Sequence, residues 1–243
     1  MAGDDLAGDW QAADWSRAAT SALDLWRDAG VDTLIDEAPR DWMARSTPPA
    51  APALPPAAPV PRSLPEWLAW RTGAEAPDAG WPGRRIAPAL IADAPLMVIA
   101  DVPDAEDIAA GALLADASGR LLDRMLAAIG LARPAVAIAS IALARPLGGV
   151  IPEGAAAALV DAARLMVALG RPARVLLLGQ PSWRLLALDD GALARGRLHA
   201  LNLGGGRMVP AVATLHPRFL REHPAAKAEA WKDLQLLIGE SSV

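Results

Sequence analysis

Pro95-Leu-Met-Val-Ile-Ala-Asp-Val-Pro-Asp104 is a short apolar run that ends at acidic residues, and it begins a regular pattern in the rest of the chain. Further apolar runs cover residues 135–141, 174–178 and 209–213, and helical stretches cover residues 119–129, 153–169, those after Pro181, and 225–238. Continuous apolar runs of strand length that alternate with helices are typical of parallel strands buried on both faces. The pattern predicts an α/β fold: a three-layer sandwich with a central, mostly parallel, four-stranded sheet.

The segments that follow these runs are the first candidates for a functional site. In open parallel sheets, ligands bind beyond the carboxyl ends of the strands. Here those ends lead into the segments after Ala100, Ile141, Gly179 and Ala213. We therefore expect the site to be built from these segments.

The composition excludes several classes of chemistry. The 243 residues are 53% apolar and 21% charged, which is typical of a folded globular protein and excludes disorder throughout. The chain has no cysteine. Disulfides, thiolate zinc sites, cysteine-ligated iron-sulfur clusters and a cysteine nucleophile are therefore excluded, and we expect no cofactor and no metal.

The charge is concentrated at the N-terminus. Residues 1–45 hold ten acidic side chains and four arginines, while the other 198 residues carry 18 acidic and 19 basic side chains. Residues 46–65 contain eight of the 22 prolines, which favours an extended linker. The expected organisation is an acidic, Trp-containing helical arm over 1–45, a Pro/Ala-rich linker over 46–62, and a folded domain over 63–243.

The arm has one apolar helical face, formed by Trp15, Ala18, Ala19, Leu23 and Trp26. A single short helix cannot bury such a face by itself. The face either packs on the folded domain or docks on a protein partner, and the sequence leaves both open.

A second short helix is expected directly after the linker. Ser63 and Glu66 have the spacing of a capping box, and a helix that carries Trp67 and Trp70 would end near Gly73.

No membrane anchor is expected. The longest apolar windows are much shorter than the ~20 residues that a span needs, and the acidic start Met1-Ala-Gly-Asp-Asp5 lacks the basic region of a secretory signal. We therefore expect a cytoplasmic protein.

Short motifs follow the predicted strands in a fixed order. Asp101-Val-Pro-Asp104 comes first, Gly119-Arg-Leu-Leu122 comes next, and Thr214-Leu-His-Pro217 comes last. Pro103 precedes Gly111 by eight residues and Gly119 by sixteen. This series resembles the family 4 uracil-DNA glycosylases in both motifs and spacing, over about residues 63–237. The resemblance implies the uracil-DNA glycosylase fold and a DNA partner, single-stranded or damaged.

The resemblance also implies two catalytic positions. His216 stands where the family's histidine donates a hydrogen bond to the departing uracil. Asp101 stands where the family has a glutamate beside the attacking water, and the shorter side chain can still orient water.

Other positions depart from the family pattern. The implied base pocket comprises Val102, Pro103, Asp104, Leu114 and Ser140. Leu114 replaces the stacking phenylalanine, and the single hydroxyl of Ser140 replaces the asparagine that reads the uracil edge. Asp104 replaces a glycine and adds a negative charge where a DNA phosphate would approach.

The remaining implied positions concern DNA contact and the iron-sulfur cluster. Arg195, Pro217 and Arg218 are the candidate DNA-binding residues. Ala144 and the neighbourhood of Leu159 stand where the family has two of its four cluster cysteines, so the cluster is expected to be absent, with apolar packing in its place.

Two functions remain open at this stage. One is a DNA glycosylase in which uracil excision is weak, altered or lost because its base-gripping positions have changed. The other is a catalytically inactive scaffold or protein-interaction module that uses the acidic arm.

Overall fold

The computed structural model describes residues 12–31, 60–183, 185, 195–203 and 207–239. The chain divides into two compact units, residues 1–58 and residues 59–243. In the first unit, helix α1 spans Ala12–Asp28, as predicted. Trp15, Leu23 and Trp26 on its apolar face are all exposed. Most of the predicted linker lies outside the described residues.

The second unit is built on a five-stranded sheet. The strands are β1 (Met97–Ala100), β2 (Ala137–Ser140), β3 (Val175–Leu178), β4 (Leu198–Asn202) and β5 (Met208–Thr214). Their order is β2-β1-β3-β5-β4; β4 pairs antiparallel to β5 and the other pairs are parallel. The predicted α/β fold and mostly parallel sheet are confirmed, and the predicted number of four strands is corrected to five.

The additional strand is β4, at one edge of the sheet. β1, β2 and β3 are buried along their whole length, whereas only Leu201 is buried in β4. An edge strand with mostly polar or half-exposed residues has no continuous apolar run. The sequence pattern therefore contained no signal for it.

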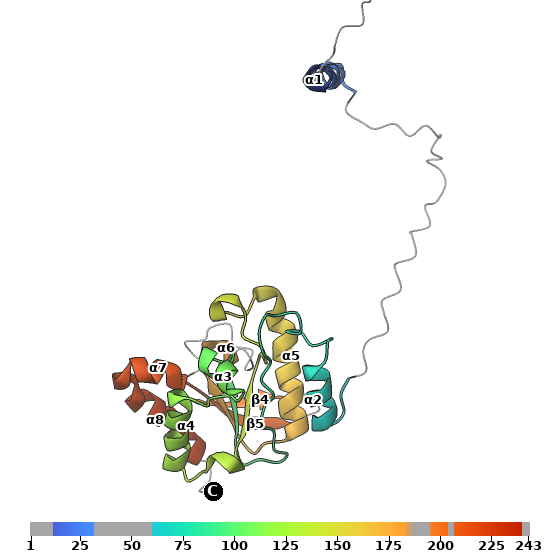
Figure 1. The fold of residues 1–243 in the computed structure, drawn as a ribbon. Helices are drawn as coiled ribbons and strands as arrows, with labels where there is room; N and C mark the ends of the chain where they lie inside the picture. The colour runs from blue at the N-terminus through green and yellow to red at the C-terminus, as the bar shows by residue number, and fades with distance from the viewer. Residues whose placement is uncertain (1–11, 32–59, 184, 186–194, 204–206, 240–243) are drawn as a thin grey trace, which may run out of the picture. The chain divides into compact units, whose positions relative to one another are not determined.

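Helices cover both faces of the sheet (Figure 1). Alternate strand residues point to opposite faces. Met97 and Ile99 pack with residues of α2 (Leu64–Thr72) and α5 (Glu153–Gly170), and Val98 packs with residues of α4 (Ala117–Ala128) and α8 (Lys227–Gly239). An apolar core therefore lies on each face of the sheet. The sheet and the helices on its two faces form the three layers of the predicted sandwich.

Ser63 caps the start of α2 as predicted, but only half of the predicted capping box is formed, because the Glu66 side chain bonds to Arg62 and not to the Ser63 N–H. The Ser63 hydroxyl accepts a hydrogen bond from the Glu66 N–H, and the Glu66 carboxylate accepts one from the Arg62 N–H at 2.8 Å. The bond to Ser63 satisfies one of the N–H donors that a helix start leaves free, and the bond from Arg62 fixes the chain just before the helix.

The remaining helical segments are short. They are α3 (Ala105–Ala110), α6 (Gln180–Trp183), α7 (Pro217–Glu222), and the 3₁₀ turns η1 (Arg133–Ala135), η2 (Leu147–Gly149) and η5 (Pro224–Ala226). Six residues or fewer show no helical period, which is why α3 and α7 are absent from the sequence predictions. Within the described residues, no helix combines the length and apolar sequence needed to cross a bilayer.

A buried ion pair ties the segment before β1 to the loop after β2. Arg71 and Asp78 pair with side chains that are 1% and 0% exposed. Asp78 also accepts the N–H groups of Leu143, at 2.6 Å, and Ala144, at 3.4 Å. Burial by itself would raise the pKa of the Asp78 carboxyl, but the hydrogen bond and charge of Arg71, with the two N–H groups, bring it below its ordinary value of 3.8.

Candidate active site

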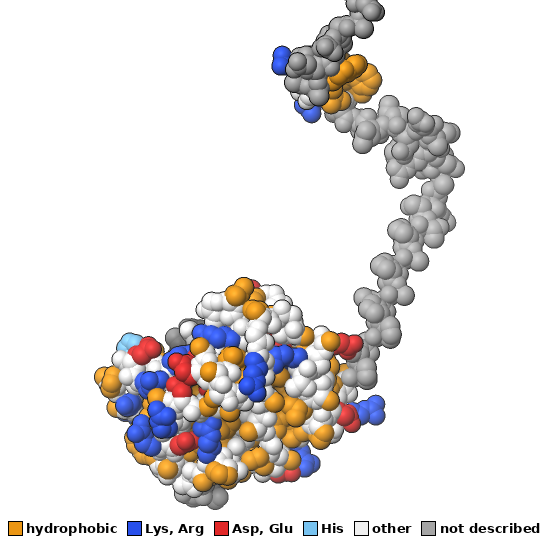
Figure 2. Space-filling model, in the orientation of Figure 1, with side chains coloured by type: hydrophobic (Ala, Val, Ile, Leu, Met, Phe, Trp, Pro, Cys, Tyr) orange, Lys and Arg blue, Asp and Glu red, His pale blue; other side chains and the backbone are white. Residues whose placement is uncertain are grey.

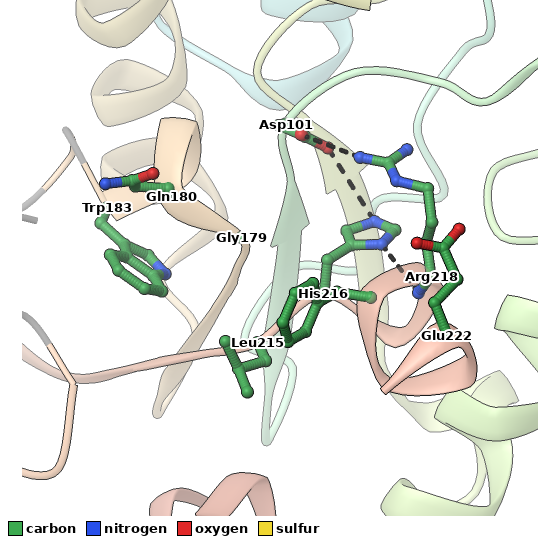
Figure 3. A pocket seen from close by; sticks show the side chains of 9 residues that line it. Asp101, Gly179, Gln180, Trp183, Leu215, His216, Arg218 and Glu222 are labelled. Atoms are coloured by element: carbon green, nitrogen blue, oxygen red, sulfur yellow. Dashed lines mark hydrogen bonds and ion pairs between the residues drawn. The ribbon is translucent and has the colours of Figure 1, made fainter. Parts of the chain in front are cut away.

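A pocket of about 360 Å³ lies where β1, β3 and β5 end. Asp101 follows β1, Gly179 follows β3, and His216 comes two residues after β5. Because the three strands are parallel, their carboxyl ends meet at one edge of the sheet, and this edge brings the three residues together (Figure 3). The other described residues that line the pocket are Gln180, Trp183, Leu215, Arg218, Phe219 and Glu222.

His216 is held in one orientation at the start of α7. It is the residue before the first helical position, which Pro217 occupies, and its Nδ1 accepts the backbone N–H of Arg218 at 3.1 Å. A ring nitrogen that accepts a hydrogen bond carries no proton, so the neutral ring has its proton on Nε2. Nε2 lies 3.9 Å from Oδ1 of Asp101, which is too far for a direct hydrogen bond.

The environment of His216 favours the neutral ring. The residue is 5% exposed, and burial is the main cause that lowers its pKa below 6.5. The nearby carboxylate of Asp101 opposes this shift, and the Arg218 guanidinium adds to it. A neutral imidazole with its proton on Nε2 can donate one hydrogen bond without first binding a proton.

Asp101 has one partnered and one unpartnered carboxylate oxygen. Oδ2 lies 3.3 Å from a guanidinium nitrogen of Arg218, while Oδ1 is buried with no hydrogen-bond partner. Gly179 has a positive φ of 84°, and a Cβ added there would lie 3.9 Å from Oδ2 of Asp101 and 3.4 Å from Cβ of His216. A buried acceptor without a partner is rare in folded proteins and indicates a place for a bound group.

Arg218 balances two acidic side chains beside the pocket. Its guanidinium pairs with Asp101 and Asp104, and Arg145 lies 3.4 Å from Asp104. Burial lowers the pKa of Arg218, but Asp101 and Asp104 outweigh it and raise the value. The charge of Asp104 is therefore compensated within the protein, which differs from the expectation that it would face a DNA phosphate.

The other implied base-pocket residues are buried. Val102 is 3% exposed and Pro103 is also buried. Leu114 packs in the core between the sheet and α4, and the Ser140 hydroxyl donates to the Ala142 carbonyl at 2.6 Å. None of these described residues belongs to the lining of the pocket that holds Asp101 and His216.

Arg195 belongs to an ion-pair network on α8. It contacts Asp233 at 3.0 Å and Glu229 at 3.1 Å, and Asp233 also accepts the Thr214 hydroxyl at 2.8 Å. The structure therefore places Arg195 in a contact that ties α8 to the sheet.

Six of the described lining residues were not among the predicted site residues: Gly179, Gln180, Trp183, Leu215, Phe219 and Glu222. Gln180 and Trp183 come from α6, and Phe219 comes from α7. The sequence feature that could have identified Gln180 and Trp183 is their position directly after Gly179, in one of the segments where the site was expected. The pocket thus contains two aromatic side chains, although Leu114 contributes none.

The described residues contain no cluster of three or more His, Asp or Glu side chains that could hold a metal ion. Since the sequence has no cysteine, the chain also cannot supply the thiolates of an iron-sulfur cluster.

The sequence was compared with models of known protein families and with curated proteins. Residues 88–235, more than half of the chain, match the family model of the Uracil DNA glycosylase superfamily. This segment includes the residues that line the pocket. Curated proteins gave no match to the sequence.

Proposed function

Because this chain belongs to the uracil DNA glycosylase superfamily, we propose that it is a DNA N-glycosylase that acts on a base in single-stranded or damaged DNA. The observation that carries this proposal is the buried His216, whose Nε2 lies 3.9 Å from Oδ1 of Asp101 in a pocket at the strand ends, where burial lowers the pKa of the ring. In the proposed reaction the base leaves with the electron pair of the glycosidic bond, a water oxygen forms the new bond to the sugar carbon, and the proton that this water loses ends on the released base.

In this proposal His216 stabilises the departing base. Negative charge develops on the base as the bond breaks, and a fixed donor close to that charge lowers the barrier. The bond from the Arg218 N–H to Nδ1 keeps the donor proton on Nε2. The ring therefore needs no rearrangement when the charge appears.

Asp101 is the proposed partner of the attacking water. Its unpartnered Oδ1 is an acceptor that a water molecule would satisfy. Arg218 holds the other oxygen at 3.3 Å, so the carboxylate has a fixed direction. This role requires no thiol, metal or other cofactor.

Basic side chains support DNA as the partner. Figure 2 shows Lys and Arg side chains gathered on the face that carries α4 and α7, and phosphates are attracted to such a surface. Pro217 and Arg218 lie at the start of α7 beside the pocket and are proposed to contact DNA. Arg195 would contribute only if its pairs with Asp233 and Glu229 opened.

The base preference is proposed to differ from that of an efficient uracil enzyme. Leu114 and Ser140 stand at the family's stacking and reading positions, and neither lines the pocket. Val102, Pro103 and Asp104 remain proposed as its supporting wall because they continue directly from Asp101.

Within the superfamily we propose a relation to family 4 with the iron-sulfur cluster lost. Ala144 and Leu159 are both 0% exposed, and the nearby Asp78 contacts bind the loop that holds Ala144. Iron in stoichiometric amounts, or a brown colour, in the purified protein would contradict this proposal.

A second candidate is a catalytically inactive protein that docks on a partner through its N-terminal arm. The observation that favours it is the exposed apolar face of α1, with Trp15 67%, Leu23 66% and Trp26 61% exposed. For this second candidate we propose the same division of the chain: an arm over 1–45, a linker over 46–62 and a glycosylase-like domain over 63–243.

The test is base release from defined oligonucleotides. Single-stranded and duplex DNA that carries uracil or hypoxanthine is incubated with the protein and then cleaved at abasic sites with alkali. We expect cleavage with at least one substrate and none with Asp101→Asn. DNA binding without any cleavage would favour the inactive candidate.

A further inference from the structure

Two buried polar atoms without partners belong to side chains that line the same pocket. They are Oδ1 of Asp101 and the indole Nε1 of Trp183. The first has a role in the proposed reaction, as the acceptor for water. The second has none, although leaving a buried donor unsatisfied costs about 1–3 kcal/mol.

Trp183 is held firmly in place. It is 7% exposed and belongs to the core that also contains Ile99 and Leu177 from the sheet. The turn before it is fixed by Ser182, whose hydroxyl donates to the Gly179 carbonyl at 2.7 Å. The indole is therefore a preorganised wall of the pocket, and its orientation costs little when a ligand binds.

The chemistry of the indole restricts what it can bind. Nε1 is a donor only, so its partner must be an acceptor. The neighbouring lining residues Leu215 and Phe219 present apolar surface, which suits a flat ring better than a phosphate. A nucleobase with an exocyclic carbonyl oxygen combines the two features.

We propose that Trp183 is a base-recognition residue, which donates a hydrogen bond from Nε1 to a carbonyl oxygen of the base. This inference rests on the proposed function, because it takes the pocket to be the base site. It moves base reading from the end of β2, where Ser140 lies, to the short helix α6 after β3, which carries Trp183 (Figure 3).

Base binding requires a small local movement. Nε1 of Trp183 has almost no exposed surface. Gln180 is exposed and lies three residues before Trp183, about one helical turn away. We expect its side chain to swing aside and the base oxygen to take the space beside the indole.

The experiment observes the indole N–H of Trp183 by ¹H–¹⁵N NMR. The full chain labelled with ¹⁵N has nine tryptophans, and the signal that disappears in Trp183→Phe identifies Trp183. Free uracil and free hypoxanthine are added in turn. Pyrimidine, the same ring as uracil without its carbonyl oxygens, is the ligand control.

The expected result has two parts. At least one of the two carbonyl bases moves the Trp183 indole proton downfield, and pyrimidine does not. Trp183→Phe, which keeps an aromatic ring but loses the donor, weakens binding of that base about tenfold. Trp231→Phe on α8 is the matched control, since Trp231 is 39% exposed and lies outside this pocket, and it leaves the affinity unchanged.

The inference and the proposed function fail in different ways. If neither base moves the Trp183 signal, or if uracil and pyrimidine move it equally, the inference is overturned, even when abasic sites are formed. If a carbonyl base moves the signal and no oligonucleotide loses its base, recognition by Trp183 stands and excision is contradicted.

Discussion

His216 shows how one backbone contact sets a chemical state. The N–H of Arg218 occupies Nδ1, and burial lowers the pKa of the ring below 6.5. The proton required for donation is thus on Nε2 over a wider range of pH than in a free imidazole.

The first prediction concerns the pH dependence of this ring. Since the folded pKa is lowered, His216 in the folded protein reaches half protonation at a lower pH than a free imidazole does. The unfolded chain takes up the proton first, so His216 contributes a loss of stability on acidification. An NMR titration of the ring should give a pKa below 6.5. A value above 6.5 would contradict the description of the site.

The second prediction concerns Gly119 at the start of α4. A Cβ at this position would lie 1.7 Å from the Leu114 carbonyl oxygen, so the backbone must move. We expect Gly119→Ala to lower the free energy of unfolding by about 2–4 kcal/mol. Urea unfolding of the native chain and of Gly119→Ala measures this loss.

Gly154, in the first turn of α5, is the matched control for this change. A Cβ there meets nothing within 4 Å, and alanine is the better helix former by ~1 kcal/mol. Gly154→Ala should therefore leave the protein equally or more stable. Equal losses in both variants would show that the close approach at Gly119 has no effect.

The sequence indicated part of the site. Asp101 and His216 follow apolar strands, and parallel strands must bring such residues to one edge. Trp183 could not be selected in this way, because its place in the pocket depends on the turn at Gly179 and on packing against the sheet. Arg195 was selected by motif, yet its partners on α8 are 34 and 38 residues away in the chain.

At the scale of elements, strands were predictable to the extent that they are buried. β1, β2 and β3 are buried on both faces and appear as continuous apolar runs. β4 forms an edge, and its pairing with β5 is decided by long-range contacts. The same limit applies to α3 and α7, which contain six residues each.

The third prediction tests the ion pair that joins α2 to the loop after β2. Asp78→Ala leaves Arg71 buried without its partner, and we expect a loss of about 3–5 kcal/mol in the free energy of unfolding. Asp93→Asn is the control: Asp93 and Arg171 are 61% and 57% exposed, such pairs contribute less than about 1 kcal/mol, and asparagine tolerates the positive φ of 53° at this position.

The Asp78 pair also has a defined pH dependence. The folded pKa is lowered below 3.8, so the stabilisation is complete above 3.8 and disappears as the pH falls through the folded value. Acid unfolding of the native protein should therefore show a step that Asp78→Ala lacks. A similar loss for Asp78→Ala and Asp93→Asn at neutral pH would contradict this account of the pair.

At the scale of the whole molecule, the two units differ in how they bury apolar surface. The unit over 59–243 contains both cores of the sheet. The described side chains of α1 from Trp15 onward are exposed.

The fourth prediction follows from this difference. Removal of residues 1–58 should change the free energy of unfolding of the remaining unit by less than about 0.5 kcal/mol, as measured by urea denaturation. A larger loss would mean that the arm stabilises the glycosylase-like unit. It would also remove the support for docking on a partner through the arm.

The measurement that tests the central claim most directly is the single-turnover rate of abasic-site formation. It compares the native chain, His216→Ala, and His199→Ala on β4 as the matched control. Loss of one donor to the departing base predicts a rate reduced roughly 10²- to 10³-fold in His216→Ala, with His199→Ala unchanged. Equal rates in the native chain and His216→Ala, or no abasic sites from any substrate, would contradict a glycosylase mechanism at this pocket.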